Sequence, residues 1–299
     1  MTPQTLRTID GRLLCYAQWG DPAGFPVFSL HVTPGCRLNR YPDDDAVAAV
    51  GARLITYDRP GYGRSDRHRG RKVVDCVADV AAIADALGVE RFAVTGGSGG
   101  GPHALAVAAR LPDRVAIARC VVGVAPVDAA SLDWTAGMDP ENVKEFGWSL
   151  AGEATLYEEL SRVAASMVAN VAADASKVLG DEWQLAEADR ATMRNPIVMQ
   201  VMREAIPECV VNGPWGWVDD DLAFTTDWGF DLDEIKVPVE VHYGSQDVLV
   251  PAAHGAWLAA NVPGAKVVVN DDQGHMDTPE HALELLRTLV YDSTRGGSR

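Results

Sequence analysis

The chain has 299 residues, of which 47% are hydrophobic and 23% are charged, and its formal net charge at pH 7 is -16. These proportions are ordinary for a globular protein and, with no low-complexity tract or fixed-period repeat, they exclude a disordered chain and a solenoid. The large negative charge repels polyanions, so we expect a small-molecule substrate as partner and no nucleic acid or anionic membrane surface.

No segment of the chain predicts export or insertion into a membrane. The N-terminus lacks the apolar run of about 7 to 15 residues that is typical of a signal peptide, and no later run approaches ~18 uncharged apolar residues. The five cysteines form no C-x-x-C pair, which predicts free thiols and no structural zinc site. We therefore expect a cytoplasmic protein that holds no metal, and leave open whether it forms a homo-oligomer.

The first half of the chain alternates strand-like and helix-like segments. The strand patterns occupy residues 25–31, 53–58, 91–96 and 115–126. A helix is predicted over residues 73–87, where apolar residues recur with a 3.6-residue period and Gly88 follows as a left-handed cap. Another helix pattern follows the third strand. This alternation predicts a parallel sheet with crossover helices.

A long helical stretch then interrupts the strand pattern. No comparable strand occurs from Asp128 to about Phe230, and one helix is predicted to begin at Asp139 with a proline in its first turn. The strand pattern resumes at residues 237–244 and 266–270. We therefore predict a mostly parallel central sheet flanked by helices, with an inserted helical cap at residues 127–230 and a core made of residues 1–126 and 231–299.

Residues 94–105 read VTGGSGGGPHAL, between a predicted strand and a predicted helix. A phosphate-binding P-loop needs a lysine and a hydroxyl residue where this chain has Pro102 and His103. The dinucleotide fingerprint G-x-G-x-x-G also fails at this proline. Residues 96–100 fit G-x-S-x-G, in which the glycines allow a strained serine turn to pack between strand and helix. The motif predicts Ser98 as a nucleophile.

With this serine turn, the strand–helix alternation and the helical insertion, the chain resembles the capped, esterase- and peroxidase-like branch of the α/β-hydrolase superfamily. Four stretches carry the resemblance: HVTPG (31–35), DRPGYGRSD (58–66), GGSGG (96–100), and YGSQDVLVP (243–251) together with GH (274–275). The chain order Ser98, Asp247, His275 is the order of the catalytic triad in this fold. The resemblance therefore implies an α/β-hydrolase fold with these three residues as its triad.

His275 is the histidine best placed to be the base, because it follows the terminal strand at the sheet edge where ligands gather in open α/β folds. A serine hydroxyl needs such a base, and histidine ionises nearest neutral pH. Asp247, just past the strand 237–244, is predicted to orient the imidazole and offset its charge. Asp128 is the second candidate for this acid.

The resemblance also implies an oxyanion hole made by the backbone amides of Gly99 and Thr33. Removing one such donor costs on the order of 3 to 4 kcal/mol of transition-state stabilisation. Val32 stands where the family has glycine, so we expect a shifted loop if that glycine has a positive φ in relatives. Pro34 and Gly35 keep the rest of the family's pattern.

Six of the eight tryptophans lie between residues 127 and 230, which predicts an apolar pocket under the cap. Trp134 and Met138 are the residues that we expect to face this pocket. The acidic run Asp219–Asp221 is expected to be solvated surface. No lysine or arginine flanks Ser98, and the arginines that could turn toward it are in neighbouring loops: Arg37, Arg59 and Arg64.

The resemblance implies a cofactor-free serine hydrolase that cleaves an ester or related acyl bond of a small to medium, apolar substrate. Relatives with the same triad cleave carbon–carbon bonds, release N-terminal proline, or form peracids that oxidise halides, and these activities remain alternatives. An iminopeptidase would need acidic residues at the amine, for which Glu204 and Glu208 are candidates. The non-enzyme alternative is a protein that binds a small ligand on the same fold.

Overall fold

The apolar runs of the chain form one eight-stranded sheet in a computed structural model that describes residues 3–295. Its strands are β1 (Gln4–Arg7), β2 (Leu13–Gly20), β3 (Phe25–Leu30), β4 (Ala52–Tyr57), β5 (Phe92–Gly97), β6 (Val115–Val121), β7 (Val239–Gly244) and β8 (Lys266–Asn270). The order across the sheet is β1-β2-β4-β3-β5-β6-β7-β8. The pairs β1–β2 and β2–β4 are antiparallel and all other pairs are parallel, which confirms the prediction of a mostly parallel sheet.

The antiparallel strands β1 and β2 were not predicted from the sequence. Strand β2 is buried at most positions, so it lacks the alternation of apolar and polar residues that reveals a half-exposed strand. Leu14 and Tyr16 pack into the core on one face of the sheet, and Ala17 and Trp19 pack into the core on the other.

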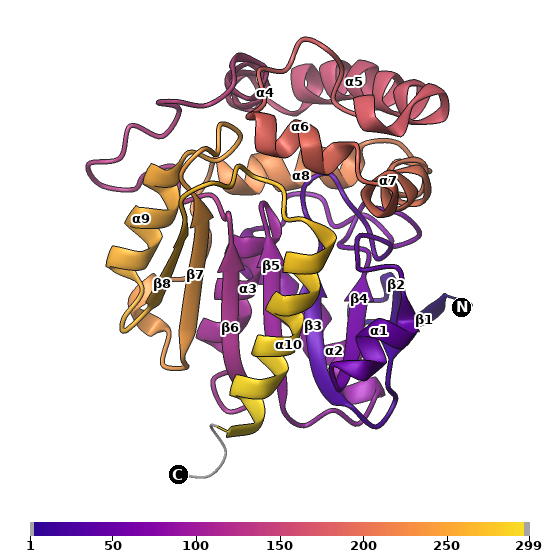
Figure 1. Cartoon of the computed structure of the whole chain (residues 1–299), viewed down its shortest axis with the longest axis vertical. Helices are drawn as coiled ribbons and strands as arrows, with labels where there is room; N and C mark the ends of the chain where they lie inside the picture. The colour runs from indigo at the N-terminus through magenta and orange to yellow at the C-terminus, as the bar shows by residue number, and fades with distance from the viewer. Residues whose placement is uncertain (1–2, 296–299) are drawn as a thin grey trace.

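Helices cover both faces of the sheet. One face carries α1 (Asp44–Ala49) and α10 (Pro279–Arg295), and Figure 1 shows α10 crossing in front of the central strands. The other face carries α2 (Cys76–Ala86), α3 (Gly100–Arg110) and α9 (Ala252–Asn261). The predicted helix over residues 73–87 begins as a 3-10 turn at Val73–Asp75 and continues as α2.

Five helices lie between β6 and β7 in the chain, and we call them the insertion: α4 (Pro140–Ala151), α5 (Glu153–Ala173), α6 (Glu187–Met193), α7 (Pro196–Cys209) and α8 (Trp215–Phe224). Figure 1 shows them as a layer above the sheet. The insertion has its own apolar core, which includes Leu156, Met167 and Trp217. Asp139 caps α4 by accepting a hydrogen bond from the N–H of Glu141, as its position before a first-turn proline predicts.

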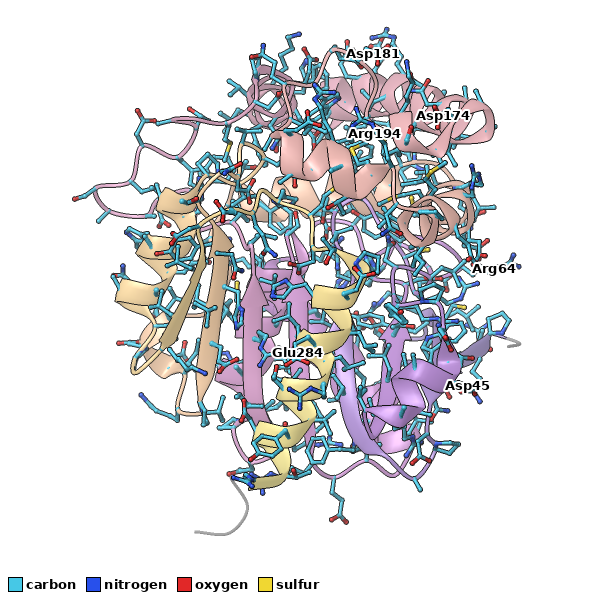
Figure 2. The ribbon with its side chains drawn as sticks, in the orientation of Figure 1. Asp45, Arg64, Asp174, Asp181, Arg194 and Glu284 are labelled. Carbon is cyan, nitrogen blue, oxygen red and sulfur yellow. The ribbon has the colours of Figure 1, made fainter. Side chains whose placement is uncertain are left out.

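The outer side of the insertion is charged. Figure 2 labels Asp174, Asp181 and Arg194 there, with their side chains at the surface. Among residues 3–295, no helix combines the length and the apolar character that crossing a bilayer requires. All five cysteines are free and buried.

Candidate active site

Ser98 occupies the turn between β5 and α3 and has a φ of 51°, a conformation that residues with side chains rarely adopt. Its neighbours two positions away must be glycine. A Cβ at Gly96 would overlap the carbonyl group of Gly100, and a Cβ at Gly100 would overlap the carbonyl oxygen of Leu30. The two glycines therefore let strand and helix approach closely enough to hold the serine in this strained turn.

His275 and Asp247 are paired at the same end of the sheet. The Nδ1 atom of His275 lies 2.8 Å from Oδ2 of Asp247, whose Oδ1 accepts hydrogen bonds of 2.8 Å from the N–H groups of Leu249 and Val250. With its Nδ1–H donated to the carboxylate, the imidazole keeps Nε2 free to accept a proton. Asp128 is exposed and makes no hydrogen bond to His275 within the described chain.

The protonation of His275 is governed by two opposing effects. Burial of the ring disfavours the imidazolium, but the charge and the hydrogen bond of Asp247 outweigh burial, so the pKa of His275 is raised above its ordinary value of 6.5. Asp189 adds to this increase. The arrangement therefore favours proton uptake by His275 near neutral pH.

Asp189, on α6, is a buried carboxyl residue that was not among the sequence-predicted site residues. Its Oδ1 accepts a hydrogen bond of 2.7 Å from the N–H of Met276, and a Cβ at Gly274 would overlap its carboxyl group. The insertion thus holds the residues on both sides of His275. No signal in the local sequence predicts this contact, because the loop and α6 are more than eighty residues apart.

The loop that contains Thr33 lies directly against the serine turn. A Cβ at Gly99 would overlap the side chain of Thr33, so the two residues whose amides were predicted as oxyanion donors are neighbours. Val32 is not among the residues with positive φ, so valine fits this loop without the strain considered from the sequence. The Arg59 guanidinium stabilises the loop by donating hydrogen bonds to the carbonyl oxygens of His31 and Val32.

Ser98, Thr33, Gly99 and His275 line one cavity of about 630 Å³. Its walls come from the sheet edge and from the insertion, and they are mainly apolar: Phe146, Trp148, Met167, Trp183, Met202 and Phe224 are among the lining residues. Such a cavity is large enough for a small to medium organic molecule.

Comparison with known proteins identifies the family of this chain. A family model described as the alpha/beta hydrolase fold matches residues 24–282. The chain belongs to the α/β-hydrolase family. It is 33% identical over 265 residues to a non-heme chloroperoxidase of Streptomyces lividans, a match that covers 86% of this chain and 87% of that protein. The protein is therefore a hydrolase-family enzyme.

Two further likenesses support less: one covers only about a third of the chain, and the other has low sequence identity. A proline iminopeptidase of Xylella fastidiosa is 37% identical over 112 residues, which make up 35% of this chain and 34% of that protein. The structure of an esterase from Exiguobacterium antarcticum superimposes on this chain with a TM-score of 0.67 and 18% sequence identity. The superposition covers 98% of this chain and 100% of the esterase. That low identity shows the shared fold alone.

The structure corrects the expectation for the pocket residues of this α/β-hydrolase. Trp134 and Met138 are buried but do not line the cavity, because they pack into the core beside the sheet. The indole of Trp134 donates to the carbonyl oxygen of Ala125 and packs edge-on against Phe146, which does line the cavity. Trp148, Trp183 and Trp217 are the tryptophans of the insertion that face it.

The acidic run Asp219–Asp221 is also not where the sequence analysis placed it, because all three residues are buried. Asp220 accepts hydrogen bonds of 2.6 Å from Arg59 and from Arg71 and one of 2.8 Å from Tyr62. Burial by itself raises the pKa of the Asp220 carboxyl, but the two arginines outweigh burial and hold that pKa well below its usual range. Buried charge is tolerated here because it is paired.

None of the three arginines in the loops near Ser98 lines the cavity. Arg59 is fully buried in the cluster around Asp220. Arg37 pairs with Asp58 and Glu208, each at 2.7 Å. Arg64, labelled at the margin of the molecule in Figure 2, is mostly exposed and pairs with the same glutamate at 2.7 Å. Glu208 is therefore engaged away from the cavity.

Proposed function

We propose that this protein is a cofactor-free serine hydrolase that cleaves an ester or related acyl bond of a small to medium, largely apolar substrate through an acyl-enzyme. The observation that carries the proposal is the strained serine turn, which opens into the same cavity as His275, while Asp247 binds the far side of the imidazole. A nucleophile, a base and an orienting acid on one cavity are the parts that acyl transfer needs.

In the proposed mechanism the Ser98 hydroxyl attacks the acyl carbon while Nε2 of His275 takes up its proton. Asp247 holds the imidazole and stabilises the imidazolium that forms. The backbone amides of Thr33 and Gly99 donate to the oxygen that becomes negative, each contributing about 3 to 4 kcal/mol of transition-state stabilisation. His275 then protonates the leaving group and later activates the water that releases the acyl group from Ser98.

A second candidate function is perhydrolysis, because the relative that matches most of this chain at 33% identity is a non-heme chloroperoxidase. It would use the same acyl-enzyme, with hydrogen peroxide attacking in place of water to release a peracid that oxidises halide. Iminopeptidase and carbon–carbon hydrolase activities remain weaker alternatives. Glu204 and Glu208, the acids considered for an amine, do not line the cavity that contains Ser98.

The test of the proposal is covalent labelling together with turnover. A fluorophosphonate probe should label wild-type protein at Ser98 and should leave Ser98→Ala unlabelled, and p-nitrophenyl butyrate should be hydrolysed only by the wild type. Addition of hydrogen peroxide and a halide acceptor dye separates perhydrolysis from simple hydrolysis. Labelling at another residue, or equal turnover by Ser98→Ala, would refute the serine mechanism.

A further inference from the structure

The wall of the cavity contains two carboxyl groups that the proposed mechanism does not use. Glu145 projects from α4 and Asp221 from α8, two helices of the insertion that pack against each other. Both residues line the cavity, with exposed fractions of 8% for Glu145 and 1% for Asp221. Two acids from different helices thus meet in a largely apolar wall, where an ionised carboxylate is costly unless it is paired.

Neither carboxyl has a cationic partner within the described residues. The indole N–H of Trp217 donates a hydrogen bond of 2.7 Å to Oε1 of Glu145, and both carboxyl oxygens of Asp221 lack a hydrogen-bond donor. Arg59 and Arg71 bind the adjacent Asp220 and form no ion pair with Asp221 or Glu145. Glu145 and Asp221 therefore lack the neutralising positive charge that Asp220 receives.

The surroundings of this pair are acidic as well. Five carboxyl residues line the cavity: Glu141, Glu145, Glu182, Asp221 and Asp277. Two arginines also line it, but Arg40 pairs with Asp44, and Arg162 pairs with Glu158 and Glu159. Glu141 pairs with Lys144 and Asp277 contacts His281, so the lining carboxyls that have no cationic partner within the described residues are Glu145, Glu182 and Asp221.

The titration of the pair follows from its burial. Burial raises the pKa of Glu145 to about 7, although the hydrogen bond from the indole of Trp217 opposes this increase. Burial, together with the charges of Glu145 and Asp220, raises the pKa of Asp221 well above its usual range, and Arg71 opposes this only in part. Both carboxyls therefore ionise less readily than exposed ones, and a cation that contacts them would favour their ionised forms.

We propose that Glu145, backed by Asp221, is a recognition site for a protonated amine on an otherwise apolar substrate. This inference rests on the proposed function, since the amine would belong to the molecule that Ser98 attacks. An ammonium group would supply the missing charge and donate to the oxygen atoms of the pair. Trp148 and Trp217, which also line the cavity, would contact the alkyl part and add a cation–π contribution.

Competition between matched ligands tests this site. n-Hexylammonium and 1-hexanol, which have the same apolar chain, are compared as inhibitors of p-nitrophenyl butyrate hydrolysis at about pH 8, where the alkylamine is still protonated. We expect the ammonium ion to inhibit about tenfold more strongly, as a hydrogen bond to a charged group predicts. Glu145→Gln keeps the volume and the acceptor for Trp217, and should abolish this preference.

Glu141→Gln is the matched control, because Glu141 lines the cavity on the same helix but is paired with Lys144. This variant should retain the preference for ammonium. Asp221→Asn provides an independent second variant and should weaken the preference. Equal inhibition by the two ligands in the wild type, or a preference that persists in both Glu145→Gln and Asp221→Asn, would overturn the proposed site.

Calorimetric binding separates this inference from the proposed function. Titration of n-hexylammonium and 1-hexanol into Ser98→Ala measures the same preference without any turnover. Tighter binding of the ammonium ion by Ser98→Ala, together with an absence of ester hydrolysis by the wild type, would support the amine site and refute the esterase proposal. Ester hydrolysis by the wild type without any preference for the ammonium ion would support the esterase proposal and refute the amine site.

Discussion

The hydroxyl of Thr33 donates a hydrogen bond of 2.6 Å to Asp220, a fully buried carboxylate on helix α8 of the insertion. Arg59 donates to the same hydroxyl at 2.9 Å and to the same carboxylate at 2.6 Å. The loop beside Ser98 is thus fixed by a cluster that joins the sheet to the insertion. His103 lies between this cluster and the serine turn, since its Nε2 is 3.7 Å from Oδ1 of Asp220 and its Nδ1 is 2.8 Å from the carbonyl oxygen of Gly99.

Thr33→Val should lower kcat for p-nitrophenyl butyrate about tenfold, with a smaller change in KM. Valine keeps the shape of threonine but loses both hydrogen bonds, so the amide of residue 33 would be less well held when the oxyanion forms. Thr33→Ser retains the hydroxyl and should keep most of the wild-type kcat. Steady-state kinetics of the two variants decide the point, and an unchanged kcat in Thr33→Val would show that the hydroxyl has no positioning role.

Ser98→Ala should fold like the wild type but lose ester turnover by about a millionfold, because removal of the nucleophile leaves only binding and oxyanion stabilisation. His275→Ala should lose a similar factor, and the double variant should be little worse than either single variant. Circular dichroism and active-site titration accompany the rate measurements. Losses that multiply in the double variant would mean that the two residues do not act as one unit.

Asp247→Asn should reduce kcat by about ten-thousandfold, because an amide at this position favours the wrong tautomer of His275. Asp128→Asn should change kcat by less than about twofold, since the Asp128 side chain is exposed and does not contact the histidine. The two variants are compared on the same ester. A larger loss in Asp128→Asn would transfer the orienting role to that residue.

The central strands and the glycine-flanked serine turn could be predicted because their signals are local. Strands β3 to β8 are short apolar runs separated by helix patterns, and the turn around Ser98 is specified by five consecutive residues. The pairing of Asp247 with His275 could be predicted because each residue lies just past a strand, and those two strands are neighbours in the sheet. Parallel strands deliver the residues after their carboxyl ends to one edge of the sheet.

The buried acids could not be predicted, because their burial depends on partners far away in the sequence. Asp220 is stabilised by Arg59 and Arg71, which precede it by about 150 residues, and an acidic triplet alone predicts solvent exposure. Trp134 was misplaced for a similar reason. Its position early in the insertion does not determine which way its side chain points. In the structure its indole N–H donates a hydrogen bond to the carbonyl oxygen of Ala125 in the core.

The pH dependence of kcat/KM should follow the ionisation of His275. The base must be neutral to accept a proton, so activity should rise with pH through the pKa of His275, and the midpoint should lie above 6.5 because that pKa is raised. Asp189→Asn removes a negative charge that raises this pKa, while its amide oxygen can still accept from Met276.

The acid limb of the pH–rate profile should therefore move to lower pH in Asp189→Asn. Glu187→Gln, on the same helix, is the control and should leave the limb in place, because Glu187 is exposed and pairs with Arg194. An acid limb with the same midpoint in Asp189→Asn and the wild type would show that the charge of Asp189 does not affect the pKa of His275.

The last prediction concerns the acyl group that the cavity accepts. Each methylene that enters the apolar walls should contribute about 0.8 kcal/mol, or about fourfold in kcat/KM, until the cavity of about 630 Å³ is filled. The specificity constants for p-nitrophenyl acetate, butyrate, hexanoate and decanoate should accordingly rise and then fall. A carboxylate at the end of the acyl chain should be disfavoured, because three of the lining carboxyls have no cationic partner within the described residues and the two lining arginines are paired with other acids. A flat profile, or a preference for the p-nitrophenyl monoester of adipic acid over the hexanoate that is lost in Arg40→Ala or Arg162→Ala, would show that charge rather than apolar burial selects the substrate.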